Sequence, residues 1–179
     1  MQTPTMPRVP LAHLPTPLDP LPRLGAALGG LDLWLKRDDL TGLAFGGNKT
    51  RKLELLLAAA QTAEADCLVT CGAAQSNHCR QTAAAAARSG MACTLVLRGD
   101  PPPRVNGNLL LDQLLGADLV WAGARPLAEA QAEAIDRLQN AGKRPYAIPY
   151  GGSSPLGAAA YALALTELLA QGPAPDWIV

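Results

Sequence analysis

The sequence predicts an α/β fold in which a parallel sheet is covered by helices on both faces. Short continuous apolar segments alternate with longer segments of helical periodicity between residues 66 and 172, an order typical of parallel strands joined by right-handed helical crossovers. Glycines stand where several of the expected helices should end. The hydrophobic content of 49% with 17% charged and 4% aromatic residues suits helices packed closely on a sheet.

The region before the sheet contributes one short strand and the start of a helix. After a proline-rich beginning, LDLWLKRDDLTG (31–42) alternates in a way that predicts a strand closed by a turn. In FGGNKTRKLELLLAAA (45–60), apolar residues recur at helical spacing behind two glycines and an asparagine. We therefore expect a helix to open close to Lys49.

Four strands and their helices follow. The strands are uninterrupted apolar runs, expected at 66–73, at 92–99, in the second half of 109–123, and at 145–152. The helices are amphipathic or alanine-rich segments with glycine stops, expected at 76–90, in the first half of 109–123, at 127–143, and at 154–172. PAPDWIV (173–179) resembles the opening of a further strand, so we expect this chain to stop short of its natural end.

The bulk properties narrow the function classes. Lysine plus arginine equals aspartate plus glutamate, so charge gives no argument for a nucleic-acid partner or an anionic membrane surface. No apolar run reaches 18 residues and the start lacks a signal-peptide pattern. Cys67 and Cys71 share one strand about 13 Å apart, too far to bridge. We expect four reduced cysteines, no metal site and a cytoplasmic location.

Lys49 is the first candidate functional residue. At about 100° per residue, Leu53, Leu56 and Ala60 fall within roughly 40° of Lys49, whereas Arg51, Glu54 and Ala58 take the opposite side. Lys49 is therefore predicted to face inward, and Lys52 to reach water from the flank. A buried lysine kept partly neutral is a candidate nucleophile toward an aldehyde; the alternative is a lysine that extends its amine to solvent.

A phosphate-binding loop is a second interpretation of the same segment. Gly42, Gly47, Lys49 and Thr50 nearly match the pattern G-x-x-x-x-G-K-[ST], but Asn48 separates the second glycine from the lysine. The charged segment KRDDLT also stands where that loop requires a buried strand.

Two turns follow the carboxyl ends of expected strands, where ligands bind in open parallel sheets. They are GAAQSNH (72–78) and YGGSS (150–154). Ser76 or Asn77 can cap the next helix, whose free N–H groups then suit a carboxylate or a phosphate. His78 and Cys79 point about 100° apart on a helix, which argues against a thiol–imidazole dyad.

Four segments together resemble the D-cysteine desulfhydrase and 1-aminocyclopropane-1-carboxylate deaminase family of pyridoxal-phosphate enzymes, which has a tryptophan-synthase-β-like fold. They are LKRDDLTGLAFGGNKTRKLE, GAAQSNHCRQTAAAAA, NGNLLLDQLLGADLV and IPYGGSSPLGAAAY. The resemblance implies that Lys49 is the Schiff-base lysine and that Lys52 is a bystander. It assigns cofactor contacts to Asn48 and Asn77, a nucleophilic or proton-carrying role to Ser76, and substrate binding to the set Gln75, Ser76, Asn77 and His78.

The resemblance also implies an organisation. Residues 46–158 would form a small domain carrying the lysine and the carboxylate-binding turn, residues 1–45 would belong to a larger α/β domain, and 159–179 would begin its remainder. The phosphate-binding loop of the family would follow Val179. A homodimer is implied for the full-length protein.

The function implied is β-elimination from D-cysteine to pyruvate, sulfide and ammonia. Deamination of 1-aminocyclopropane-1-carboxylate and release of sulfite from cysteate are alternatives within the family. Two hypotheses of other classes remain, namely a phosphate-loop nucleotide-binding protein and a non-catalytic packing domain.

Overall fold

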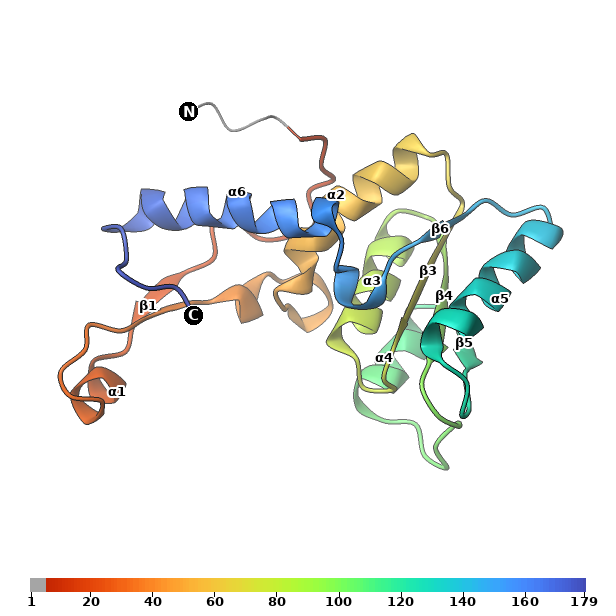
Figure 1. Ribbon diagram of the computed structural model, residues 1–179, viewed down its shortest axis with the longest axis horizontal. Coiled ribbons are helices and arrows are strands. Elements are labelled where there is room, and N and C mark those ends of the chain that lie inside the picture. The colour runs from red at the N-terminus through yellow and green to blue at the C-terminus, as the bar shows by residue number, and fades with distance from the viewer. Residues whose placement is uncertain (1–5) are drawn as a thin grey trace.

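The computed structural model describes residues 6–179, and its central feature is a four-stranded parallel sheet (Figure 1). The strands are β3 (Cys67–Gly72), β4 (Ala92–Leu97), β5 (Asp118–Trp121) and β6 (Pro145–Ala147), in the order β5-β4-β3-β6. β3 is buried along its whole length, which is why its sequence is continuously apolar rather than alternating. The α/β fold class with a parallel sheet is confirmed.

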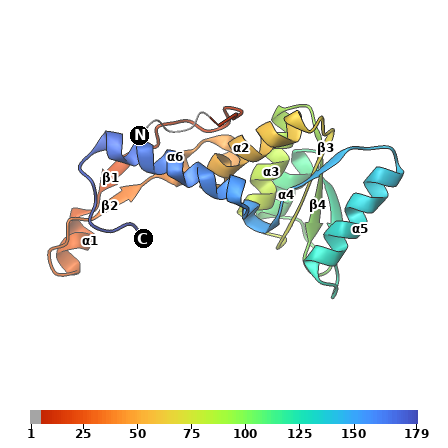
Figure 2. The ribbon, with the colours of Figure 1, turned by 45° about the horizontal axis from the view of Figure 1, so that its top comes forward.

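Helices cover both faces of this sheet, as predicted. α3 (Asn77–Arg88) packs on β3 and β4 together with α4 (Gly107–Leu114), and α5 (Leu127–Asn140) packs on the opposite face (Figure 2). Alanines 83–86 of α3 are buried, because small side chains let the helix approach the sheet closely. Gly90 and Gly142 follow their helices with positive φ angles, which glycine adopts without a Cβ penalty.

A second group of elements lies beside the sheet domain. β1 (Leu18–Pro20) pairs antiparallel with β2 (Trp34–Lys36), and the short α1 (Pro22–Ala27) connects them. The long α6 (Pro155–Gln171) runs back to this hairpin, where Gln171 Nε2 donates a hydrogen bond of 2.9 Å to the Thr16 carbonyl. β1 and α1 were not predicted, because the proline-rich sequence in which they lie shows no clear strand or helix pattern.

α2 (Lys49–Thr62) joins the two groups and is buried on almost every side. The prediction that Arg51, Glu54 and Ala58 form an exposed side is wrong. Glu54 accepts hydrogen bonds from the backbone N–H groups of Leu11 and Ala12 at 2.9 and 3.0 Å, and Arg51 is enclosed by acidic groups. The helical wheel, which places residues at about 100° intervals, assumes that a helix has one buried face. α2 instead packs against α3, α6 and the N-terminal segment.

The end of the chain corrects another expectation. Residues 173–179 do not form a strand, because no neighbouring strand in the described part of the chain offers them hydrogen-bond partners. β6 is also shorter than predicted: after Ala147 the chain turns into a 3₁₀ segment, Tyr150–Gly152. The four cysteines are free, as predicted, and all four are buried. Within residues 6–179, no helix is long and apolar enough to cross a membrane.

Candidate active site

The two turns selected from the sequence lie at the same edge of the sheet. β3 and β6 are parallel neighbours, with Cys67 opposite Pro145, so their carboxyl ends point the same way. β3 leads into the turn before α3, and β6 leads into Tyr150–Gly152, which packs against α2 and α3. The sheet therefore brings the start of α2, the start of α3 and the glycine turn 150–152 together.

The turn before α3 has the predicted cap. The Ser76 hydroxyl accepts a hydrogen bond of 3.2 Å from the Cys79 N–H, while Ser76 itself is in an extended conformation. Asn77, the first residue of the helix, is exposed. A capped, twelve-residue helix presents its remaining N–H groups and the positive end of its dipole at this edge.

The loop before Lys49 is fixed by polar contacts rather than left open for a ligand. Thr41 Oγ1 donates to the Gly47 carbonyl at 2.8 Å and accepts from the Gly47 N–H at 2.9 Å. A Cβ on Gly47, whose φ is +130°, would stand 2.4 Å from Gln81 Nε2. A glycine is therefore required at this position because the Gln81 side chain packs against the loop.

Lys49 lies between the glycine turn and the start of α3. Its side chain is half-buried, and its Nζ donates to Asn48 Oδ1 at 3.3 Å. A Cβ placed on Gly151 would be 3.9 Å from Lys49 Cε, and its charge acts on His78 at the start of α3. The amine is thus held near both turns, although it is less buried than the wheel predicts.

Lys52 is the buried lysine of α2, contrary to the prediction that it reaches water. Only 9% of it is exposed. Its Nζ donates to the Gly151 carbonyl at 3.2 Å and lies 5.7 Å from the centre of the Tyr161 ring. Burial lowers the pKa of Lys52, and the neighbouring charge of Lys49 lowers it further. Neither lysine forms an ion pair within residues 6–179.

His78 is buried under the glycine turn. Its Nε2 lies 3.0 Å from Thr70 Oγ1, and that hydroxyl donates its hydrogen to the Ile148 carbonyl at 2.9 Å. His78 Nε2 must therefore carry the N–H, which leaves Nδ1 as a buried acceptor without a partner among the described residues. Burial lowers the pKa of His78 to about 4, helped by Lys49 and Lys52. In this arrangement the imidazole is neutral and its N–H is already engaged.

Gln75 and Asn77 belong to an amide network that the sequence analysis did not predict. Asn108 donates from its backbone N–H to Gln75 Oε1 at 2.8 Å, and from Nδ2 to Asn77 Oδ1 at 2.8 Å. Gln75 Nε2 reaches Asn106 at 3.2 Å. In the sequence, only the NGN tripeptide at 106–108 could have indicated this network. It lies about 30 residues along the chain from the turn that it supports.

Several other features do not form reactive sites. Burial raises the pKa of the Cys79 thiol to about 12, so it is no nucleophile. The lysine loop follows a 3₁₀ turn, Leu43–Phe45, rather than a strand, which removes the geometry of a phosphate-binding loop. Among residues 6–179, no cluster of three His, Cys, Asp or Glu side chains is arranged to hold a metal.

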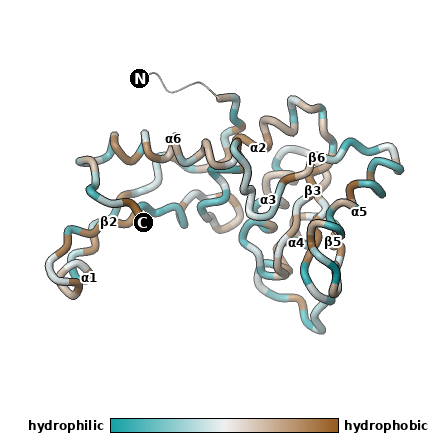
Figure 3. Tube along the Cα trace, viewed as in Figure 1, coloured by the Kyte–Doolittle hydropathy of each residue, from teal (hydrophilic) through white to brown (hydrophobic). Residues whose placement is uncertain are grey.

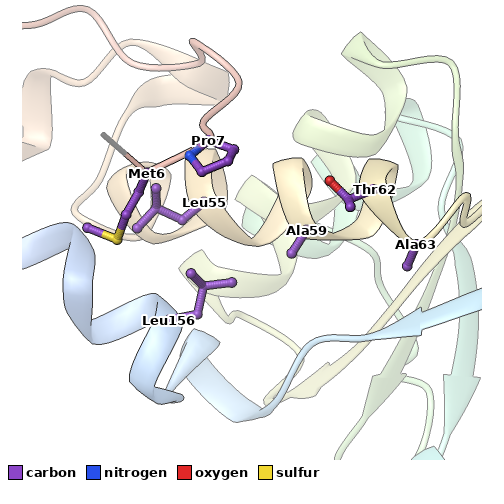
Figure 4. Close-up of a pocket in the computed structure, with 7 residues that line it drawn as sticks. All are labelled: Met6, Pro7, Leu55, Ala59, Thr62, Ala63 and Leu156. Atoms are coloured by element: carbon purple, nitrogen blue, oxygen red, sulfur yellow. The ribbon is translucent and has the colours of Figure 1, made fainter. Parts of the chain in front are cut away.

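An apolar hollow lies apart from Lys49. It has a volume of about 390 Å³ and lies between the N-terminal segment, α2 and α6 (Figure 4). The lining residues are Met6, Pro7, Leu55, Ala59, Thr62, Ala63 and Leu156. Without a titratable group, this hollow offers no catalytic chemistry.

Comparison with known proteins places these features in a family. A family model described as "Pyridoxal-phosphate dependent enzyme" matches residues 9–179. The D-cysteine desulfhydrase of Salmonella typhi is 44% identical over 171 residues, 92% of this chain and 52% of that protein. A Pyrococcus abyssi protein with the provisional name 1-aminocyclopropane-1-carboxylate deaminase is 43% identical over 172 residues, 92% of this chain and 50% of that protein. The crystal structure of an ACC deaminase homologue matches with a TM-score of 0.88 and 40% identity, over 95% of this chain and 52% of that one. The chain therefore spans about half the length of these relatives.

Proposed function

The chain belongs to the pyridoxal-phosphate dependent enzyme family, and from that premise we propose that the protein eliminates sulfide from D-cysteine, with pyruvate and ammonia as the other products. The observation that carries the proposal is the position of Lys49, held between the glycine turn and the positive end of α3. The name of the Salmonella relative, at 44% identity, supports the choice of D-cysteine.

The residues at this edge fit an anionic cofactor that carries an aldehyde. Lys49 supplies an amine able to condense with the aldehyde, and Asn48 supports that amine at 3.3 Å. Lys52 adds a second positive charge that no carboxylate among the described residues neutralises. Asn77 presents an exposed side chain at the start of α3. We expect Lys49, Asn48 and Asn77 to contact the cofactor, with Lys52 as an anion-binding group rather than a bystander.

Each group of the chain has a role in this proposal. Backbone N–H groups at the start of α3, with Gln75, Ser76 and Asn77, bind the substrate carboxylate. His78 contributes its backbone rather than its ring, because the ring N–H points to Thr70. Lys49, when released from the aldehyde, removes the proton from the substrate α-carbon, and Ser76 is the second candidate to carry a proton. Pyridoxal phosphate supplies the ring that withdraws electrons from that carbon.

Deamination of 1-aminocyclopropane-1-carboxylate is the second candidate, favoured by the match to the ACC deaminase homologue. Release of sulfite from cysteate is the third. Incubating the protein with pyridoxal phosphate and each substrate separates them, because the diagnostic products are sulfide, 2-oxobutyrate and sulfite. The proposal of a lyase fails if a cofactor-loaded protein releases none of the three.

The organisation implied by the resemblance also stays a proposal. We propose that residues 46–158 form the small domain, with 1–45 and 159–179 in the larger one, because the sheet of four strands lies wholly within 67–147. A homodimer and a cytoplasmic location belong to the same proposal, and four buried free thiols are consistent with a reducing compartment.

Borohydride reduction of the protein with pyridoxal phosphate, followed by peptide mass spectrometry, tests the assignment of the lysine. We expect one cofactor-modified residue, Lys49, and complete loss of that modification in Lys49→Ala. Lys52→Ala is the matched control and should keep the modification at Lys49 with weaker cofactor affinity. Modification at Lys52 would contradict the assignment, and wild-type behaviour of Lys49→Ala in every assay would favour a non-catalytic packing domain.

A further inference from the structure

Arg80, on the first turns of α3, connects three separate segments at the candidate active site. Its Nη2 donates to the Gly46 carbonyl at 2.7 Å. Its Nη1 donates to Asn77 Oδ1 at 3.0 Å and to Asn108 Oδ1 at 2.7 Å. Only 7% of Arg80 is exposed, so these contacts are made by a buried cation and are expected to be strong.

Each of the three acceptors belongs to a segment with a part in the proposed reaction. Gly46 stands three residues before Lys49, in the loop that ends at the amine. Asn77 is in the turn proposed to bind the carboxylate and the cofactor. Asn108 holds that turn through its bonds to Gln75 and Asn77. No other side chain described in residues 6–179 makes hydrogen bonds to all three segments.

Asp112 of α4 is the acidic group whose charge acts on Arg80. This carboxyl group is completely buried, and its charge acts favourably on the guanidinium. Neither Asp112 oxygen nor Arg80 Nε has a hydrogen-bond partner among the described residues. Burial raises the pKa of Asp112 to about 7, against the attraction of Arg80. The three hydrogen-bond acceptors therefore hold the guanidinium, and the attraction of Asp112 is secondary.

We propose that Arg80 is a positioning residue whose guanidinium holds the loop before Lys49 in a fixed register against the carboxylate-binding turn. The planar fork suits this task, because two of its nitrogens reach acceptors on different segments at the same time. A lysine carries its three donors on a single nitrogen, so it cannot span the two sides as the separate nitrogens of the guanidinium do. Any effect of Arg80 on the reaction of Lys49 rests on the proposed function. The position of the loop relative to the turn does not.

Amide hydrogen exchange of the cofactor-free protein tests the register directly. In Arg80→Met and in Arg80→Lys, we expect exchange in 44–50 and in 104–110 to accelerate about tenfold. Exchange in β3, 67–72, should keep its wild-type rate. Arg88→Met is the matched control on the same helix, because Arg88 is exposed and makes one long contact of 3.4 Å to the Leu11 carbonyl. It should leave the two segments unchanged.

The rate at which pyridoxal phosphate becomes trapped on Lys49 by borohydride gives the second measurement. Both Arg80 variants should slow this reaction about tenfold, and Arg80→Lys should fail to rescue it although the positive charge is kept. If wild-type protein does not attach the cofactor, the proposed function fails while the exchange experiment still decides the register.

Two outcomes would overturn the proposal. One is exchange that rises equally in β3 and in the two segments, which would make Arg80 a general stabilising residue. The other is exchange in Arg80→Lys that matches wild type. Should Arg80→Met fail to fold, Asn108→Ala takes its place: it removes one acceptor, leaves the guanidinium bound to Gly46 and Asn77, and should accelerate exchange in 104–110 and 73–78. Unchanged exchange there would contradict the proposal.

Discussion

At the scale of single residues, buried charge determines how the sheet domain should respond to pH. Asp112 has no hydrogen-bond donor among the described residues to stabilise its ionised form. Its pKa in the folded protein is raised by burial to about 7 from an ordinary value of 3.8. The folded state therefore retains a proton that the unfolded chain has lost, and raising the pH through this range costs stability.

Asp112→Asn should remove that cost. The stability that wild-type Asp112 contributes is fully present below pH 3.8 and is lost as the pH rises through about 7. We expect Asp112→Asn to be more stable than wild type at pH 8 by about 2 kcal/mol, with a much smaller difference at pH 5. Urea unfolding at pH 8 and at pH 5 measures this difference in the free energy of unfolding. Asp136→Asn on α5 is the matched control, and an equal difference at both pH values would contradict the prediction.

The helix α2 shows how far single residues can be predicted from periodicity. The wheel correctly directs Leu53 and Leu56 to the core, since these residues would be buried against any single partner. It misplaces Lys52, because the partners that enclose this residue, the glycine turn and Tyr161, lie about a hundred positions away in sequence. Lys49 lies near the turn before α3, and the alternation of strands and helices does predict a ligand site at this edge of the sheet.

At the scale of elements, an ionic cluster attaches α2 and the β1–β2 hairpin to α6. Arg51 donates to Asp38 at 2.8 Å and to Glu167 at 3.0 Å, and Lys36 reaches Glu167 at 2.5 Å. Burial by itself would raise the pKa of Glu167, but hydrogen bonds from Arg51 and Lys36 outweigh it and lower the pKa to about 2. Because α2 begins at Lys49, this cluster also anchors the candidate active site.

Glu167→Gln should destabilise the protein by about 2 kcal/mol at pH 7, because two cations lose their shared carboxylate. Glu167 contributes its stability above pH 4.5, and that contribution is lost as the pH falls from there through about 2. The difference between variant and wild type should therefore shrink in acid. Thermal unfolding at pH 7 and pH 3 measures both parts of the prediction.

Glu133→Gln is the control for Glu167→Gln, because Glu133 makes its ion pair with Arg125 on an exposed surface. Exposed pairs contribute about 0–1 kcal/mol. If the two variants lose equal stability, the cluster at Glu167 does not join the elements as we infer.

The elements predicted correctly are those whose local pattern reflects their surroundings. β3 and β4 are buried on both faces, so their apolar runs identify them. β1 consists of three residues and exists through its pairing with β2, which no local pattern reveals. Residues 173–179 show the reverse case: a pattern typical of a strand forms none, because β structure requires a partner as well as a suitable sequence.

At the scale of the whole molecule, α6 leaves an apolar stripe uncovered. Few hydrophilic residues occur along it (Figure 3), and Gly157 and Ala160 are its buried residues. Tyr161, Leu165 and Leu169 recur every four residues, so they share one face, with exposed fractions of 37%, 41% and 47%. A helix that is apolar around much of its circumference is normally covered by other protein.

We therefore expect the 179-residue protein to self-associate through α6 as its concentration rises. Leu165→Gln, at the middle of the stripe, should weaken this association about tenfold, because it places an amide in the apolar contact. Sedimentation velocity over a range of concentrations measures the effect. Leu28→Gln is the matched control, since Leu28 is also exposed but follows the end of α1 and is not part of α6. If the wild-type protein stays monomeric at every concentration, α6 is not a contact between copies. The apolar stripe then gives no support to the proposed homodimer.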